Sequence, residues 1–153
     1  MRTSLLVPHV VAGLAGLVIG PLALRAPKRP GTHTRLGAVY QWCTAVLFAT
    51  AVGLAVLRPS LWWLGLIAAA TEAAALGGWY LARRRPDGWL PAHVSLMCGS
   101  YVSFVTAFLV VNTDLAFWPA WILPTVVGSP LIARASARAA RGVTTSRPQR
   151  LVV

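Results

Sequence analysis

The chain has 153 residues, of which 57% are hydrophobic and only 11% are charged. A soluble domain of this size carries about 25% charged residues, so the composition excludes a water-soluble globule, and the apolar content excludes a disordered chain. The 14 Lys and Arg residues against 3 Asp and Glu residues give a net charge of +11. In a soluble protein this would suggest nucleic-acid binding, so the positions of the charges decide what they mean.

Five apolar runs follow one another along the chain. Each provides the roughly 20 residues that an α-helix needs to cross a bilayer. They cover residues 5–24, 36–57, 61–82, 90–111 and 115–133. We therefore expect an all-α integral membrane protein, a single domain over residues 1–135 with a bundle of about five transmembrane helices. Residues 136–153 are expected to form a flexible, basic cytoplasmic tail.

Charged and turn-forming residues separate these runs. Arg58-Pro59 follows the second run, and Arg-Arg-Arg-Pro-Asp-Gly at residues 83–88 follows the third. Such residues are ordinary in loops at the membrane surface and costly in hydrocarbon. Prolines interrupt the fifth run, which could be kinked or could enter and leave the membrane on one side. The first run could be a signal peptide, but its length and the basic loop after it favour a retained span.

The basic residues alternate between the two sides of the predicted membrane. The first loop holds four, the third loop three and the tail five, whereas Arg2 and Arg58 lie on the other side. The positive-inside rule places the N-terminus outside and the C-terminus in the cytoplasm. The positive charge is therefore an orientation signal. It indicates a multi-pass bacterial inner-membrane protein in contact with the lipid bilayer, and no nucleic-acid partner is expected.

Glu72 is the one acidic residue expected within the membrane, near the middle of the third run. Burial of a carboxyl group in a bilayer is costly, so Glu72 should face the bundle interior and be paired or protonated. With a rise of 1.5 Å per residue, Ser100 and Tyr101 of the fourth run lie at the same depth. We expect one of these two side chains to be its partner, in either a structural or a functional role.

Two of the three histidines are expected to lie at the cytoplasmic surface. His33 is in the first basic loop and His93 is one turn into the fourth run, whereas His9 lies near the opposite surface. His33 and His93 can therefore meet, and the pair would suit haem or a divalent metal. Met97 follows His93 by one helical turn and could ligate a soft metal. Ordinary helix packing also explains the stripe of residues that begins at His93 and continues to Phe108.

Other residue types carry less information. Cys43 and Cys98 both fall within predicted spans, where they are more typical of packing than of a disulfide framework. Tryptophans and tyrosines, Tyr40 among them, gather near the ends of the runs as an aromatic belt. The sequence holds no H-E-x-x-H, no G-x-S-x-G and no phosphate-binding glycine loop, so it does not indicate an enzyme.

Two stretches resemble a known family. Residues 33–40 match H-x-R-L-G-x-x-Y, and residues 93–101 match H-x-x-x-M-x-x-S-Y. Both patterns resemble those of a family of small multi-pass bacterial membrane proteins classed as a domain of unknown function, and the likeness covers roughly residues 30–133. Thr34 and Val94 stand where many relatives have arginine. The resemblance implies a compact helical bundle and directs attention to His33, His93, Met97, Ser100 and Tyr101.

We therefore expect a polar pocket that opens to the cytoplasm. It would bind a haem, a metal held by His33 and His93, or a small lipophilic ligand, or would relay protons or electrons. One alternative is a structural or assembly subunit of a membrane complex or homo-oligomer, with Glu72 paired across a subunit interface. Another is a small transporter. The candidate site residues are His33, Glu72, His93, Met97, Ser100 and Tyr101.

Overall fold

The computed structural model describes residues 2–28, 31–113 and 116–145, which form five α-helices and one short 3₁₀ segment. The elements are α1 (Arg2–Arg25), α2 (Thr32–Leu57), η1 (Pro59–Leu61), α3 (Trp62–Arg84), α4 (Trp89–Asn112) and α5 (Trp118–Thr145). The expected all-α fold is confirmed over these residues. Helices α1 to α4 begin and end within four residues of the predicted spans.

Helices α1 to α4 are each long and apolar enough to cross a membrane, and α5 is not in this group. The fifth run nevertheless forms one continuous helix through Pro124 and Pro130. The alternative in which this run turns back on itself is therefore wrong. The helix also continues to Thr145, through the first ten residues of the expected flexible tail. The rest of that tail, residues 146–153, lies outside the described residues.

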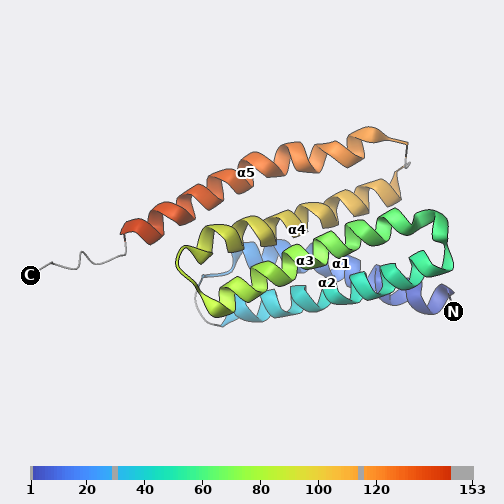
Figure 1. The fold of residues 1–153 in the computed structure, drawn as a ribbon, viewed down its shortest axis with the longest axis horizontal. Helices are drawn as coiled ribbons and strands as arrows, with labels where there is room; N and C mark the ends of the chain where they lie inside the picture. The colour runs from blue at the N-terminus through green and yellow to red at the C-terminus, as the bar shows by residue number, and fades with distance from the viewer. Residues whose placement is uncertain (1, 29–30, 114–115, 146–153) are drawn as a thin grey trace, which may run out of the picture.

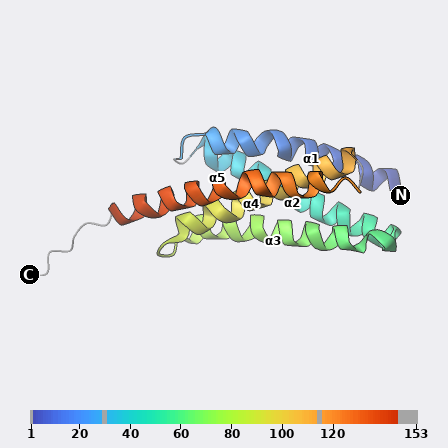
Figure 2. The same cartoon turned by 90° about the horizontal axis from the view of Figure 1, so that it is seen from above.

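The first four helices form an antiparallel bundle, and α5 lies outside it (Figure 1). Each of α1, α2 and α3 packs on the next helix, and α4 returns to contact α1. Helices α2 and α4 therefore face each other diagonally, as do α1 and α3, which lie at opposite sides in Figure 2. Helix α5 packs mainly on α4, and its Trp121 ring also contacts the Trp63 ring of α3, with ring centres 5.5 Å apart. The start of α1 and the end of α5 lie at opposite ends of the molecule.

Glycines in α1 allow aromatic side chains of α4 to close the bundle. A Cβ atom at Gly16 would overlap the Phe104 ring, and one at Gly20 would overlap the Tyr101 ring. The Tyr101 hydroxyl donates a hydrogen bond of 3.1 Å to the carbonyl oxygen of Leu17. The contact between α1 and α4 therefore depends on two aromatic rings that lie against glycine backbone.

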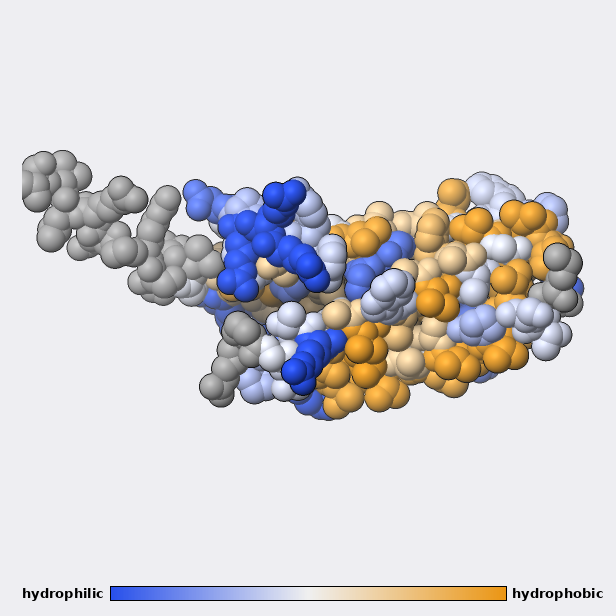
Figure 3. All heavy atoms as spheres, turned by 90° about the horizontal axis from the view of Figure 1, so that it is seen from below, coloured by the Kyte–Doolittle hydropathy of each residue, from blue (hydrophilic) through white to orange (hydrophobic). Residues whose placement is uncertain are grey.

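The distribution of apolar side chains is the reverse of that in a soluble bundle. Small or polar residues such as Thr44, Ala75 and Ser100 are buried, whereas Trp42 and Val56 are each 73% exposed. Apolar side chains cover the middle of the surface and hydrophilic ones gather at one end (Figure 3). An apolar surface of this extent is unstable in water and ordinary in lipid, where small residues let helices pack closely. The packing therefore supports a membrane location for the bundle.

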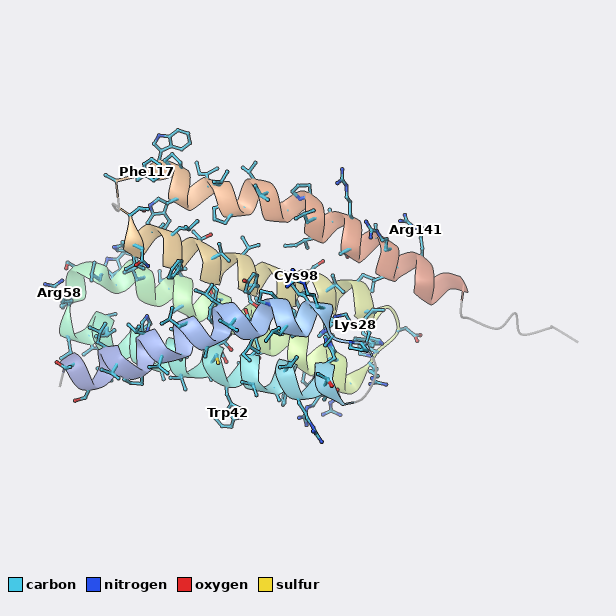
Figure 4. All side chains as sticks on the ribbon, turned by 180° about the vertical axis from the view of Figure 1, so that it is seen from behind. Lys28, Trp42, Arg58, Cys98, Phe117 and Arg141 are labelled. Carbon is cyan, nitrogen blue, oxygen red and sulfur yellow. The ribbon has the colours of Figure 1, made fainter. Side chains whose placement is uncertain are left out.

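Basic residues gather at one end of the bundle, here called the basic end. It comprises the α1–α2 loop, the α3–α4 turn and the C-terminal half of α5, and Lys28 and Arg141 lie toward it in Figure 4. Arg58 lies at the opposite end, where α5 begins near Phe117. The tight α3–α4 turn needs Gly88, whose φ of 70° is in the left-handed region that favours glycine. The charge asymmetry read from the loops is thus present in the folded chain.

Candidate functional site

Two imidazole rings meet across the bundle at the basic end. His33 lies in the first turn of α2 and His93 in the second turn of α4. Their ring centres are 6.5 Å apart and the ring planes are nearly perpendicular, at 80°. The two residues are 60 positions apart in the chain and belong to diagonal helices. Because successive helices of the bundle alternate in direction and have similar lengths, α2 and α4 both begin at the basic end. This brings the two histidines to one level, as the depth estimate from the sequence predicted.

Each ring is held by a backbone carbonyl group. His33 Nδ1 donates to the carbonyl oxygen of Ala23 at 2.9 Å, and His93 Nδ1 donates to that of Gly78 at 2.7 Å. A carbonyl oxygen only accepts, so in the neutral rings the proton lies on Nδ1 and Nε2 keeps its lone pair. This is the usual arrangement of a metal-ligating histidine, whose second nitrogen is fixed by an outer hydrogen bond.

The position of His93 depends on a glycine in α3. Met97 Cγ and Sδ lie 2.8 Å from the place where a Cβ at Gly78 would be, so Met97 packs directly on the glycine backbone. This close approach lets His93, one turn earlier in α4, reach the Gly78 carbonyl group. Met97 therefore serves as a packing residue between α3 and α4. Trp89 covers another side of His93, with ring centres 5.6 Å apart.

Lys28 adds positive charge beside the histidine pair. Its Nζ donates to the carbonyl oxygens of Leu24 at 2.6 Å and Ala23 at 3.0 Å, and so caps the C-terminus of α1. Partial burial lowers the pKa of the Lys28 ammonium group from its usual range. Because Ala23 also accepts from His33, the end of α1 holds both groups in one place.

Glu72 is buried in the middle of the bundle, but its partner is not the one expected. Gln41 Nε2 of α2 donates to Glu72 Oε1 at 2.8 Å. The predicted partners are engaged elsewhere, because Tyr101 donates to Leu17 and the Ser100 hydroxyl donates to the Met97 carbonyl oxygen at 2.8 Å. The depth estimate was correct, but the rotation of α4 about its axis turns these two hydroxyls away from α3.

Two oxygen atoms of this polar pair have no described partner. Glu72 Oε2 and Gln41 Oε1 are both buried without a hydrogen bond to another described residue. A buried acceptor without a partner is costly, and a proton on the carboxyl group or a bridging water relieves that cost. Glu72 therefore has one partner within its own chain and capacity for one more bond.

Tyr40 is a second buried polar group that the sequence assigned to the aromatic belt. It is only 2% exposed, and its hydroxyl donates to Ser100 Oγ at 3.0 Å, because the Ser100 hydrogen is already used. The Tyr40 ring also contacts that of Phe104, with centres 5.5 Å apart. Tyr40 thus links α2 to α4 next to Gln41, the partner of Glu72, and the belt assignment was wrong.

His9 lies apart from these groups, in the half of α1 away from the basic end. Its Nδ1 bonds to Thr50 Oγ1 at 2.8 Å, and the Thr50 hydroxyl donates to the Val46 carbonyl oxygen at 2.7 Å. His9 therefore donates to Thr50. No second imidazole accompanies it.

The six residues singled out from the sequence thus divide into separate groups. His33 and His93 lie together, Met97 packs behind His93, and Ser100, Tyr101 and Glu72 each bond to different partners. Among the described hydrogen bonds, none joins the side chain of one of these six residues to the side chain of another. The residues missed were Gln41, Tyr40 and Gly78. Gln41 carried the clearest signal, because a carboxamide in the middle of an apolar run needs a hydrogen-bond partner.

The donor set limits what the basic end can hold. Within the described residues, no group of three or more His, Cys, Asp and Glu side chains is placed to bind a metal ion. A bare divalent ion that relied on protein ligands would need three or four such groups. The pair of imidazoles is therefore suited to a ligand that brings most of its own coordination.

Comparison with known proteins gives no match: no protein family, no curated protein and no solved structure is similar enough to this chain to be significant.

Proposed function

We propose that the protein is a five-span bacterial inner-membrane protein that binds haem between His33 and His93. The N-terminus would lie outside and the basic end in the cytoplasm, because basic residues are retained on the cytoplasmic side. Helix α5 would cross as the fifth span with its C-terminal part in the cytoplasm. The family resemblance carried by residues 33–40 and 93–101 fits this location but defines no activity.

The observation that carries the haem proposal is the pair of imidazoles held at Nδ1 and facing each other on diagonal helices. Haem iron takes four nitrogens from its own ring and needs only axial ligands from the protein. Two histidines are therefore sufficient for haem, whereas they leave a bare metal ion with too few ligands.

The two rings come from diagonal helices and their centres are 6.5 Å apart. His33 and His93 would each offer Nε2 to the haem iron, because the Nδ1 atom of each ring is engaged by a carbonyl oxygen.

Charge at the basic end supports the same ligand. Lys28 lies beside the pair, and Arg25 and Arg35 are exposed at the ends of the helices that carry or hold His33. Positive charge disfavours a bare cation, but it suits the propionate groups of haem, which are anionic. A bound haem would supply a one-electron redox centre near the cytoplasmic surface.

The assembly and transporter alternatives both relied on Glu72. Gln41 of α2 already bonds to its Oε1 atom within the same chain, and its Oε2 atom is buried without a hydrogen bond to a described residue. Glu72 therefore gives less support to either alternative than the histidine pair gives to haem binding.

The test is an absorption spectrum of the full-length protein, expressed with a haem supply and purified in detergent. We expect a Soret band and about one haem per chain, with the band lost in His33→Ala and in His93→Ala. His9→Ala is the matched control, because it removes the one other imidazole and should keep the band.

Folding of each variant is checked by circular dichroism and thermal unfolding. Free imidazole added to His93→Gly should restore part of the band, which a merely misfolded variant would not allow. A wild-type protein that takes up no haem, or a His9→Ala loss equal to that of the paired histidines, would overturn the proposal.

A further inference from the structure

An apolar groove runs along the outside of the bundle between α1, α4 and α5. Its volume is about 420 Å³. Leu24 of α1 forms one wall, α4 forms the floor from Cys98 to Val105, and α5 forms the other wall from Pro124 to Ala135. This groove is separate from the histidine pair, which lies between α2 and α4.

The groove exists because α5 is held on α4 and does not contact α1. Gly128 of α5 packs on Val102, with 2.6 Å between a Val102 methyl carbon and the place of a Cβ at Gly128. Nearer the basic end, Ser136 donates to the carbonyl oxygen of Pro91 at 3.1 Å. These two contacts fix the wall of α5 while the side toward α1 stays open.

The dimensions of the groove match one leaflet of a bilayer. Its α5 wall, from Pro124 to Ala135, is about 16 Å long at a rise of 1.5 Å per residue. Half of a hydrocarbon core of about 30 Å is nearly the same length. Ala135 lies at the level of the first turn of α4, because the next residue bonds to Pro91. The groove thus extends from the basic end to about the middle of the bundle.

Two cations lie where the groove reaches the basic end. Lys28 Nζ is 2.6 Å from the carbonyl oxygen of Leu24, a groove residue, and two carbonyl bonds leave one of its three N–H donors unused. Arg138 follows Leu131 by seven residues and Ala135 by three, so it continues the groove-facing side of α5. Among the described residues, neither cation has a carboxylate partner.

We infer that the groove binds an anionic phospholipid, with an acyl chain along α4 and α5 and the phosphate group between Lys28 and Arg138. An apolar channel one leaflet long with cations at its membrane-surface end fits this ligand, since basic pockets between helices on the cytoplasmic side select anionic headgroups. The inference rests on the membrane location proposed above; it does not require haem, although Lys28 would serve both ligands.

The test measures lipid selectivity of the full-length protein, first shown to be in the membrane fraction and then purified in detergent. Native mass spectrometry with phosphatidylglycerol and phosphatidylcholine of the same acyl chains should show preferential binding of phosphatidylglycerol. Lys28→Gln and Arg138→Gln should each weaken that binding about fivefold, because each basic residue near the surface contributes to anionic lipid binding. Arg35→Gln, on a helix that does not line the groove, should leave it unchanged.

The apolar part is tested by filling the groove. Ala135→Trp puts a large side chain into the groove and should reduce phosphatidylglycerol binding at least tenfold. Ala137→Trp, on the opposite face of α5, should leave phosphatidylglycerol binding unchanged. Glycerol 3-phosphate, which has the anionic group without acyl chains, should not compete at the same concentration.

Three results would overturn the inference: equal binding of the two lipids, an Arg35→Gln loss equal to that of Lys28→Gln, or full competition by glycerol 3-phosphate. A groove occupied by a second copy of this chain would instead give a dimer that Ala135→Trp dissociates, with no lipid selectivity. Loss of the protein from the membrane fraction would be a separate result, against the location itself.

Discussion

The two ends of the bundle each contain histidine, but in different surroundings. At the basic end, His33 and His93 face each other from diagonal helices, and each ring is fixed by a carbonyl group of a third or fourth helix. Toward the opposite end, His9 bonds to the hydroxyl of Thr50 and has no second imidazole. All three rings donate through Nδ1. The difference that matters for ligand binding is therefore the second ring.

The two ends also differ in how tightly their helices approach. At Gly20, near the basic end, a Cβ would overlap the rigid Tyr101 ring. At Gly53, toward the other end, a Cβ would lie 3.0 Å from a terminal methyl group of Leu5, which is flexible. The helices around the paired histidines are therefore closely packed, whereas the region around His9 is more tolerant of an added side-chain atom.

The largest expected effect is from Gly20→Ala. The Tyr101 ring would have to move, and overpacking of this kind costs about 1–3 kcal/mol. We expect a clear fall in the thermal midpoint in detergent. Gly53→Ala is the matched control and should be near neutral, because the Leu5 methyl can shift and alanine is the better helix former. Equal effects of the two would contradict the proposed difference between the ends.

The next effect concerns the polar pair that lies between the two ends. Gln41→Leu removes the donor to Glu72 Oε1 and should destabilise the bundle by about 1–3 kcal/mol. Adding Glu72→Leu should recover most of this, because no polar group is then left unpaired. A double variant less stable than Gln41→Leu would show that Glu72 is stabilised by another partner.

A smaller effect tests the basic end without removing a ligand atom. Gly78→Ala should push Met97 and α4 away from α3 and displace His93. We expect haem affinity to fall about tenfold, equivalent to about 1.4 kcal/mol, in a spectroscopic titration. Gly77→Ala, whose Cβ would meet only Leu96 at an ordinary 3.4 Å, should bind haem like the wild type. The comparison separates positioning of the ring from a general loss of stability.

The smallest effect is expected at the other end. His9→Ala and Thr50→Val each remove one hydrogen bond between neutral side chains, which contributes about 0.5–1.5 kcal/mol. Thermal midpoints should fall slightly and haem binding should not change. A spectral change in either variant would mean that the two ends are coupled.

Much of the fold could be predicted, because hydrophobic runs, charged loops and prolines each have a direct cost or benefit in a bilayer. The candidate site was predictable only in part. Depth along a helix follows from counting residues, so the meeting of His33 and His93 could be anticipated. Rotation about the helix axis does not follow from counting, which is why Glu72 was assigned to Ser100 or Tyr101 and not to Gln41.

The amino-acid sequence by itself determined the helices, their alternation and the concentration of positive charge at one end, because these depend on composition within each segment. Only the tertiary structure decided which polar groups meet. Glycines at positions 20 and 78 let particular helices come close, and that approach sets the rotation of α4. The same packing placed α5 outside the bundle and so formed a groove, which no single segment contains. Pairing and shape arise between helices, so they depend on side chains far apart in the chain.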